Sequence, residues 1–136
     1  VVAGDINRPN GLAFSPDEAL LYVSDTSAAL PGQGSNHCLW GFDVVDGRAL
    51  ANGSVFAEVS PGVPDGFRVD AGGRLYVSAL DGVHVYDPDG TRIGRIAVPE
   101  KVGNVTFGGA QRDTLYIAAS SSLYCIQLAT RGVQRP

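Results

Sequence analysis

Residues 10–24 read Asn-Gly-Leu-Ala-Phe-Ser-Pro-Asp-Glu-Ala-Leu-Leu-Tyr-Val-Ser, and two later segments of the chain repeat this pattern. The second, residues 65–78, reads Asp-Gly-Phe-Arg-Val-Asp-Ala-Gly-Gly-Arg-Leu-Tyr-Val-Ser. The third, residues 103–118, reads Gly-Asn-Val-Thr-Phe-Gly-Gly-Ala-Gln-Arg-Asp-Thr-Leu-Tyr-Ile-Ala. Each segment is typical of a short strand, a polar turn and a second strand rich in β-forming residues. The sequence therefore predicts a fold built from a repeated unit.

Further segments with strand character follow each repeat. They are residues 39–43 and 54–59, then 82–86 and 92–97, and finally 122–127. Four strands per unit, at a spacing of roughly 40 to 55 residues, are typical of a β-propeller, in which four-stranded sheets surround a central channel. No segment combines a sustained helical period with caps. We therefore expect an all-β chain of about three propeller blades.

The predicted domain organisation is a single half-propeller over residues 1–136. It comprises the outer strand of a preceding blade (1–4), two blades (10–60 and 64–98) and a blade that lacks its outer strand (103–128). A propeller ring can close when an N-terminal strand completes the last blade, but three blades do not form a wheel. Two open blade faces are expected. Either the missing half lies upstream of Val1, or two copies join head to tail and rebuild a six-bladed ring.

Composition excludes several classes of protein. The formal charge is −4, and the 10 basic residues form no run that would neutralise a phosphate backbone, which argues against a nucleic-acid partner. Apolar runs such as residues 19–23 are far shorter than the roughly 20 residues that span a bilayer. Cys38 and Cys125 have no CxxC partner, so we expect two buried thiols. A soluble protein is expected, with the cytoplasm favoured over the periplasm, and Val1 is not expected to be its natural start.

Repeat registry selects the candidate site residues. Asn10 and Asp65 occupy the same register, each after a proline and before a glycine, and Gly103 and Asn104 hold the corresponding place in the third unit. The starts of the innermost strands of a propeller converge on the central channel. An amide oxygen and a carboxylate that converge there suit a hard cation such as Ca²⁺. The alternative is that Pro-Asn-Gly and Pro-Asp-Gly are ordinary turns, as expected for residues 16–18 and 88–90.

Five segments together resemble the gluconolactonase, senescence marker protein and luciferin-regenerating enzyme family. They are residues 8–17, 21–25, 62–70, 81–86 and 103–108. The resemblance implies a six-bladed propeller that hydrolyses a small-molecule sugar lactone with a divalent metal in its channel. It implies that Asn10 and Asp65 are metal ligands and that Asp65 is also the general base. Ca²⁺ is the first expectation for the metal, with Zn²⁺, Mg²⁺ and Mn²⁺ as alternatives.

The chain departs from the family in one respect. The glutamate ligand of the family, and an asparagine that contacts substrate, belong to the N-terminal half and have no counterpart here. Glu18, Glu58 and Glu100 lie in turn, outer-strand and loop contexts and are not expected to replace that ligand. His37 and His84 have no acid nearby at the spacing of a triad or a metal site. Whether this chain is an enzyme by itself therefore stays open.

Three functional hypotheses follow. The first is the C-terminal half of a metal-dependent sugar lactonase, in which the metal polarises the lactone carbonyl and Asp65 assists the attack of water. The second is a non-catalytic propeller fragment that serves as a self-associating binding or scaffold module. The third keeps the metal but changes the substrate to a phosphotriester or another lactone. A serine hydrolase has little support, because Ser120–Ser122 lacks a Gly-x-Ser-x-Gly elbow.

Overall fold

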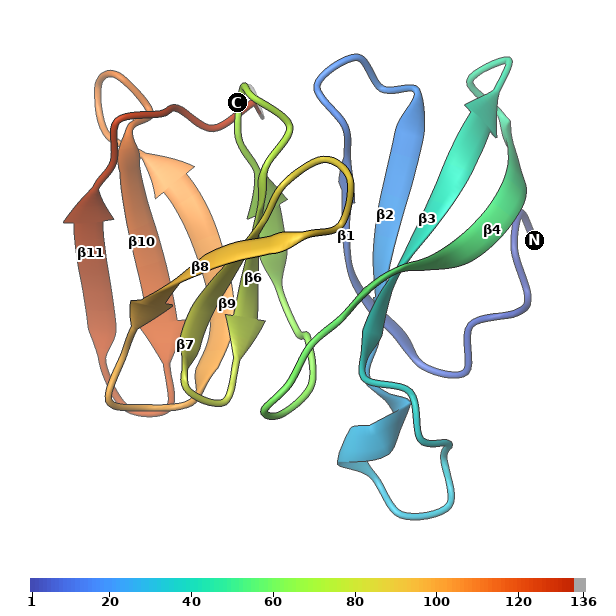
Figure 1. Cartoon of the computed structure of the whole chain (residues 1–136), viewed down its shortest axis with the longest axis horizontal. Helices are drawn as coiled ribbons and strands as arrows, with labels where there is room; N and C mark the ends of the chain where they lie inside the picture. The colour runs from blue at the N-terminus through green and yellow to red at the C-terminus, as the bar shows by residue number, and fades with distance from the viewer. Residues whose placement is uncertain (134–136) are drawn as a thin grey trace.

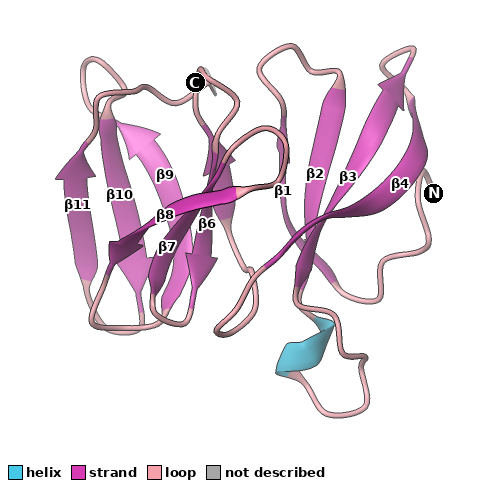
Figure 2. Cartoon of the chain, viewed as in Figure 1, coloured by secondary structure: helices cyan, strands magenta, loops and turns pink. Residues whose placement is uncertain are grey.

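A computed structural model describes residues 1–133, which form three antiparallel sheets arranged side by side (Figure 1). The first sheet contains β1 (Pro9–Phe14), β2 (Leu20–Asp25), β3 (Cys38–Val45) and β4 (Ala49–Glu58). The second contains β5 (Phe67–Val69), β6 (Leu75–Ala79), β7 (Gly82–Tyr86) and β8 (Arg92–Ala97). The third contains β9 (Val102–Gly108), β10 (Thr114–Ala119) and β11 (Leu123–Gln127). A single 3₁₀ turn, η1 (Ser27–Ala29), is the one helical element of the described residues (Figure 2), so the all-β prediction is confirmed.

Each sheet follows the order of the sequence. Neighbouring strands are joined by short connections and pair antiparallel, in the orders β1-β2-β3-β4, β5-β6-β7-β8 and β9-β10-β11. The first strands of the three sheets adjoin one another, because β5 contacts both β1 and β9, and β6 also packs against β9. The starts of these three strands form the inner rim of the assembly. This arrangement gives residues at equivalent repeat positions a common location.

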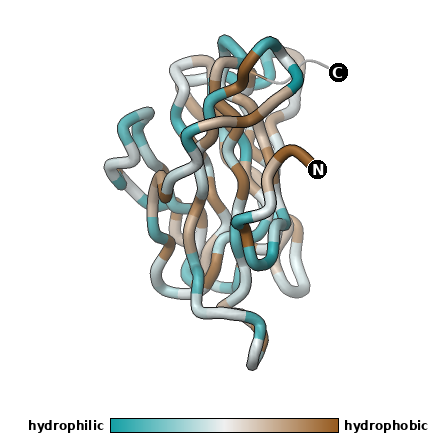
Figure 3. The backbone as a smooth tube through the Cα atoms, turned by 90° about the vertical axis from the view of Figure 1, so that its right-hand side faces the viewer, coloured by the Kyte–Doolittle hydropathy of each residue, from teal (hydrophilic) through white to brown (hydrophobic). Residues whose placement is uncertain are grey.

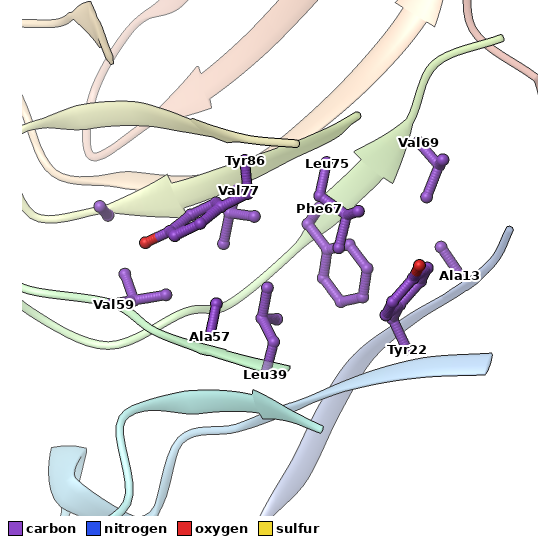
Figure 4. Close-up of a cluster of buried hydrophobic side chains, with 11 residues drawn as sticks. Ala13, Tyr22, Leu39, Ala57, Val59, Phe67, Val69, Leu75, Val77 and Tyr86 are labelled. Carbon is purple, nitrogen blue, oxygen red and sulfur yellow. The ribbon is translucent and has the colours of Figure 1, made fainter. Parts of the chain in front are cut away.

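Two apolar clusters hold the sheets together. The first lies between the first and second sheets and includes Tyr22, Leu39, Phe67 and Tyr86 (Figure 4). The second lies between the second and third sheets. Because the middle sheet has a neighbour on each side, every residue of β6 is buried, whereas a half-exposed strand would alternate between buried and exposed residues.

The outer sheets each keep one open face. On β1 the exposed Leu12 and Phe14 flank Ala13, which is buried against the second sheet. On the third sheet Tyr116 and Leu123 are exposed, with Leu123 retaining 72% of its accessible surface. Exposed apolar surface of this kind is where a further sheet would pack.

Cys125 lies on the third sheet and is exposed, whereas Cys38 is buried. The prediction of two buried thiols is therefore wrong for Cys125. The prediction rested on the usual burial of free cysteine. Within residues 1–133 no further sheet covers the face of the third sheet that carries Cys125.

The two ends of the described chain differ in their contacts. Residues 1–4 belong to no strand within residues 1–133, and Val1 and Val2 are exposed. The hydropathy colours of Figure 3 show that the N-terminal end of the chain is hydrophobic. Their predicted role as the outer strand of another blade, and the predicted domain boundaries, stay predictions. At the other end the chain crosses back to the second sheet, where Gly132 forms a bridge with Asp70 and Val133 N donates to the carbonyl oxygen of Val69 at 3.1 Å.

Candidate functional site

Asn10 and Asp65 meet where the first two sheets adjoin at the inner rim. Asn10 belongs to β1, and Asp65 immediately precedes the Gly66 that leads into β5. Nδ2 of Asn10 donates a hydrogen bond of 2.7 Å to Oδ1 of Asp65. The structure thus brings together the two side chains that repeat registry selected, although they are separated by 55 residues.

A β-bulge orients Asn10. Pro9 pairs with Asp25 and Leu12 pairs with Val23, so β1 holds one more residue than β2 between these two pairs. An extra residue bends the strand and redirects the side chains next to it. The bulge therefore accounts for Asn10 leaning toward the neighbouring sheet rather than following the regular alternation of β1.

Glycine after each site residue lets the innermost strands approach one another. A Cβ added at Gly11 would collide with the backbone oxygen of Asp65, and one added at Gly66 would collide with the side-chain oxygen of Asn104. The amide of Gly66 also donates a 2.9 Å hydrogen bond to the carbonyl oxygen of Gly103. These contacts link the three repeats at one level of the inner rim.

The turn interpretation applies to the two other proline-containing sequences. Glu18 and Gly90 have φ values of 58° and 86° and lie in turns between paired strands. Asp17 and Asp89 each accept a hydrogen bond from a backbone amide of their own turn, at 3.1 and 2.8 Å. Asn10, by contrast, is part of a strand. Similar local sequences therefore have different roles, and their position in the repeat distinguishes them.

The Asn10–Asp65 pair offers oxygen atoms of the kind that a hard cation binds. Its hydrogen bond uses Nδ2 of Asn10 and Oδ1 of Asp65, which leaves the amide oxygen of Asn10 and the second carboxylate oxygen of Asp65. Asp65 forms no ion pair with another described residue. Among residues 1–133 no group of three or more His, Cys, Asp or Glu side chains could hold a metal. The pair can supply some of the about six to eight oxygen ligands that Ca²⁺ takes.

Arg68 is a residue of this region that the sequence analysis missed. It lies on β5 and lines a hollow of about 340 Å³ together with Asn104 and Thr106. Nη1 of Arg68 donates a 2.7 Å hydrogen bond to the carbonyl oxygen of Phe67, and the buried Nε has no partner among the described residues. The sequence did mark Arg68 as unusual, because a charged residue stands there at the position where the first repeat has the apolar Ala13.

His84 has an acidic partner that the sequence analysis also missed. The imidazole is fully buried, and its Nε2 lies 2.7 Å from Oδ1 of Asp81, which is also paired with Arg95. Burial lowers the pKa of His84, and the hydrogen bond with Asp81 opposes this only in part. Burial would raise the pKa of Asp81, but the hydrogen bonds from His84 and Arg95 outweigh it and lower that pKa. This is a structural network, because its imidazole is inaccessible.

Asp25 anchors the segment between β2 and β3. This segment carries η1 and projects from the end of the sheets at which β1 begins (Figure 1). The buried carboxylate accepts hydrogen bonds from the amides of Asn7, Arg8 and Ser27 and from Nδ2 of Asn36, at 3.0 to 3.2 Å for the amides. Burial would raise the pKa of Asp25, but these hydrogen bonds outweigh it and lower the pKa.

Glu100 is held by the hairpin between β10 and β11. Its carboxylate accepts hydrogen bonds from the amide and hydroxyl of Ser121, at 2.7 and 2.8 Å, and from the hydroxyl of Tyr124 at 2.6 Å. Hydrogen bonds from Ser122, Tyr124 and Ser121 lower the pKa of Glu100 to about 2. Its oxygens are thus already engaged, in keeping with the expectation that Glu100 does not replace a missing ligand.

The chain is similar to known proteins in sequence and in fold. The model of the SMP-30/gluconolactonase/LRE-like region matches residues 1–121. The gluconolactonase of Zymomonas mobilis is 32% identical over 97% of this chain and 38% of its own length. A solved gluconolactonase structure from Xanthomonas campestris is 43% identical, with a TM-score of 0.79, over 92% of this chain and 39% of its own.

A more distant structure shares the fold. The calcium-binding protein regucalcin from Agrobacterium tumefaciens has a TM-score of 0.76 at 24% identity, over 98% of this chain and 50% of its own. The chain spans less than half the length of the gluconolactonases it matches. The similarity confirms that the three sheets are propeller blades. The chain matches only a part of the propeller of each relative.

Proposed function

Because this chain belongs to the SMP-30/gluconolactonase/LRE-like family, we propose that it forms part of a metal-dependent enzyme that hydrolyses a sugar lactone. The observation that supports this most directly is the contact between Asn10 and Asp65 at the inner rim. Gluconolactonases are among the relatives that match more than nine tenths of the chain. The substrate class is therefore a cyclic ester of a sugar acid.

The proposed roles follow from the donor atoms. The amide oxygen of Asn10 and the carboxylate of Asp65 would hold a divalent metal, which when bound supplies Lewis acidity toward the lactone carbonyl. The carboxylate of Asp65 would also orient a water molecule and accept its proton. Attack of that water on the carbonyl carbon breaks the ring C–O bond, and the released ring oxygen takes up a proton, which gives the open sugar acid with a hydroxyl at that oxygen.

Ca²⁺ is the proposed ion. The two donors are oxygens, and only one of the two groups is charged, which suits Ca²⁺ or Mg²⁺ better than a metal that prefers nitrogen or sulfur. The regucalcin structure that shares this fold is described as a calcium-binding protein. Zn²⁺, Mg²⁺ and Mn²⁺ are the alternatives. Two protein ligands hold an ion weakly, so further oxygens must come from beyond the described pair.

The open faces imply that the ring is completed by further blades. Leu12 and Phe14 expose one apolar face, and Tyr116 and Leu123 expose another at the opposite end of the row of sheets. We propose that either a second copy of this chain or the N-terminal half of the same protein packs on them. Both forms of assembly would bring additional ligands to the channel.

Hydrolysis of gluconolactone tests the proposal, measured by pH-stat on the assembled form with added Ca²⁺ and again after EDTA. We expect acid release faster than the spontaneous hydrolysis of the lactone, and we expect this excess to require the ion and to be lost in Asp65→Ala. Asp89→Ala is the matched control, because Asp89 lies in a similar proline–aspartate–glycine sequence in a surface turn. Equal rates with and without the ion, or full activity in Asp65→Ala, would contradict the proposed roles.

A further inference from the structure

Two buried serines lie behind the Asn10–Asp65 pair. Ser24 ends the Leu-Tyr-Val-Ser sequence of β2, Ser78 ends the same sequence of β6, and both are fully buried. The third repeat has Ala118 at the equivalent place. A hydroxyl therefore accompanies the two units that carry Asn10 and Asp65, and it is missing from the third.

Ser24 connects the backbones of both site residues. Its Oγ accepts a 2.7 Å hydrogen bond from the amide of Gly11, which belongs to the Asn10–Gly11 peptide. The same hydroxyl donates a 2.9 Å hydrogen bond to the carbonyl oxygen of Asp65, in the adjacent sheet. One side chain thus joins the peptide that follows Asn10 to the peptide that follows Asp65.

Ser78 has a narrower role. Its Oγ accepts a 2.9 Å hydrogen bond from the amide of Asp65. Asp65 is therefore held on both sides of its Cα, by Ser78 within its own unit and by Ser24 from the neighbouring unit. Asn10 has only the Ser24 connection of this kind, and it lies in a bulge where the regular β1–β2 pairing is interrupted.

We infer that Ser24 is a positioning residue that sets the spacing between Asn10 and Asp65 and thereby controls the affinity of the site for a divalent cation. This rests on the proposed metal site. Without the hydroxyl, the bulged peptide of Asn10 loses its connection to the second sheet, and the two oxygen donors no longer share a fixed separation. Partners that orient metal ligands typically change affinity by about 10- to 100-fold when removed.

The test compares Ser24→Ala with Ser15→Ala. Ser15 is the matched control because it is also buried, and its hydroxyl is hydrogen-bonded to Asp17 and to the amide of Leu20. It lies in the β1–β2 turn and has no bond to the peptides of Asn10 or Asp65 in these contacts. Calorimetric titration with Ca²⁺ should show about a 10-fold or greater loss of affinity in Ser24→Ala and wild-type affinity in Ser15→Ala. An equal loss in both variants, or no loss in Ser24→Ala, would overturn the inference.

A second readout does not depend on the metal. In ¹⁵N NMR spectra without Ca²⁺, the side-chain amide of Asn10 reports its hydrogen bond to Asp65. We expect this resonance to move toward that of a free amide in Ser24→Ala and to stay in place in Ser15→Ala. Ser24→Cys, which keeps the shape of the side chain but has a larger atom that hydrogen-bonds more weakly, should give an intermediate shift if Ser24→Ala does not fold.

The two readouts separate the possible failures. Failure of the assembled wild-type protein to bind any divalent ion contradicts the proposed function, while the Asn10 resonance still tests the positioning role. An Asn10 resonance that is unchanged in both Ser24 variants overturns the inference even if the metal binds.

Discussion

Nδ2 of Asn10 lies 2.7 Å from Oδ1 of Asp65, and the two residues come from different propeller blades. The contact depends on backbone approach as well as on side chains. Gly11 and Gly66 follow the two residues, and neither position has room for a Cβ. The geometry of the pair is therefore a property of the interface between the innermost strands.

Gly66→Ala should destabilise the fold by about 1–3 kcal/mol, the usual cost of inserting a methyl group into a packed region. The added Cβ would displace the side chain of Asn104. Gly94→Ala is the control, because a Cβ at Gly94 on β8 meets nothing within 4 Å. Urea denaturation measures both variants, and equal stability of the two would contradict the close approach at the inner rim.

Asp25→Asn should destabilise the protein at pH 7 by about 1–3 kcal/mol. The new NH₂ group would face backbone N–H groups, whose hydrogen bonds the carboxylate now accepts. The pKa of Asp25 is lowered in the folded state. The unfolded chain therefore binds the proton more readily, and the contribution of Asp25 is present above about pH 4 and is lost at lower pH.

Urea denaturation at pH 7 and pH 3 measures this effect. The wild type should lose more stability on acidification than Asp25→Asn does. Asp5→Asn, at an exposed position, is the control and should behave like the wild type. An identical pH dependence in the wild type and Asp25→Asn would contradict the anchoring role.

His84 should make stability depend on pH in a higher range. Burial lowers its pKa in the folded state, so the unfolded chain gains a proton first as the pH falls below about 6.5. The neutral imidazole thus favours folding above that pH, and the contribution is lost as the pH falls through the lowered pKa. The free energy of unfolding between pH 7.5 and 5.5 should fall more steeply in the wild type than in His84→Asn, and parallel slopes would argue against this.

Much of the fold could be predicted from the sequence because its signals are local. Strands β7 and β8 coincide with the predicted residues 82–86 and 92–97. The β-forming side chains identify each strand, and the turn residues on either side mark where it begins and ends. The Asn10–Asp65 contact is tertiary, yet repeat registry located it because equivalent starts of innermost strands converge.

The missed features depend on neighbours that no local pattern reveals. Asp81 lies in the β6–β7 turn and His84 on β7, three residues later, and this spacing alone does not show that the buried imidazole meets the carboxylate. Arg68 lines a hollow only because Asn104 of another sheet lies beside it. The exposure of Cys125 reflects an open blade face, which the pattern of its own strand does not record.

Ring completion predicts association through the open faces. If two copies rebuild the ring, native mass spectrometry should show a species of twice the chain mass, and Leu123→Lys should abolish it because a charge would enter an apolar interface. Ile93→Lys, at an exposed position on β8 of the middle sheet, should leave it intact. A monomer at all concentrations would favour completion by the N-terminal half of the same protein.

The most direct test of the central claim is calorimetric titration of the assembled protein with Ca²⁺, comparing the wild type with Asn10→Ala, Asp65→Ala and Asp89→Ala. The account predicts binding by the wild type and Asp89→Ala. It predicts an affinity loss of more than about 100-fold in Asp65→Ala, beyond the range seen for partners of metal ligands, and a smaller loss for the uncharged Asn10. Wild-type affinity in Asp65→Ala would contradict the claim that the Asn10–Asp65 pair holds the metal.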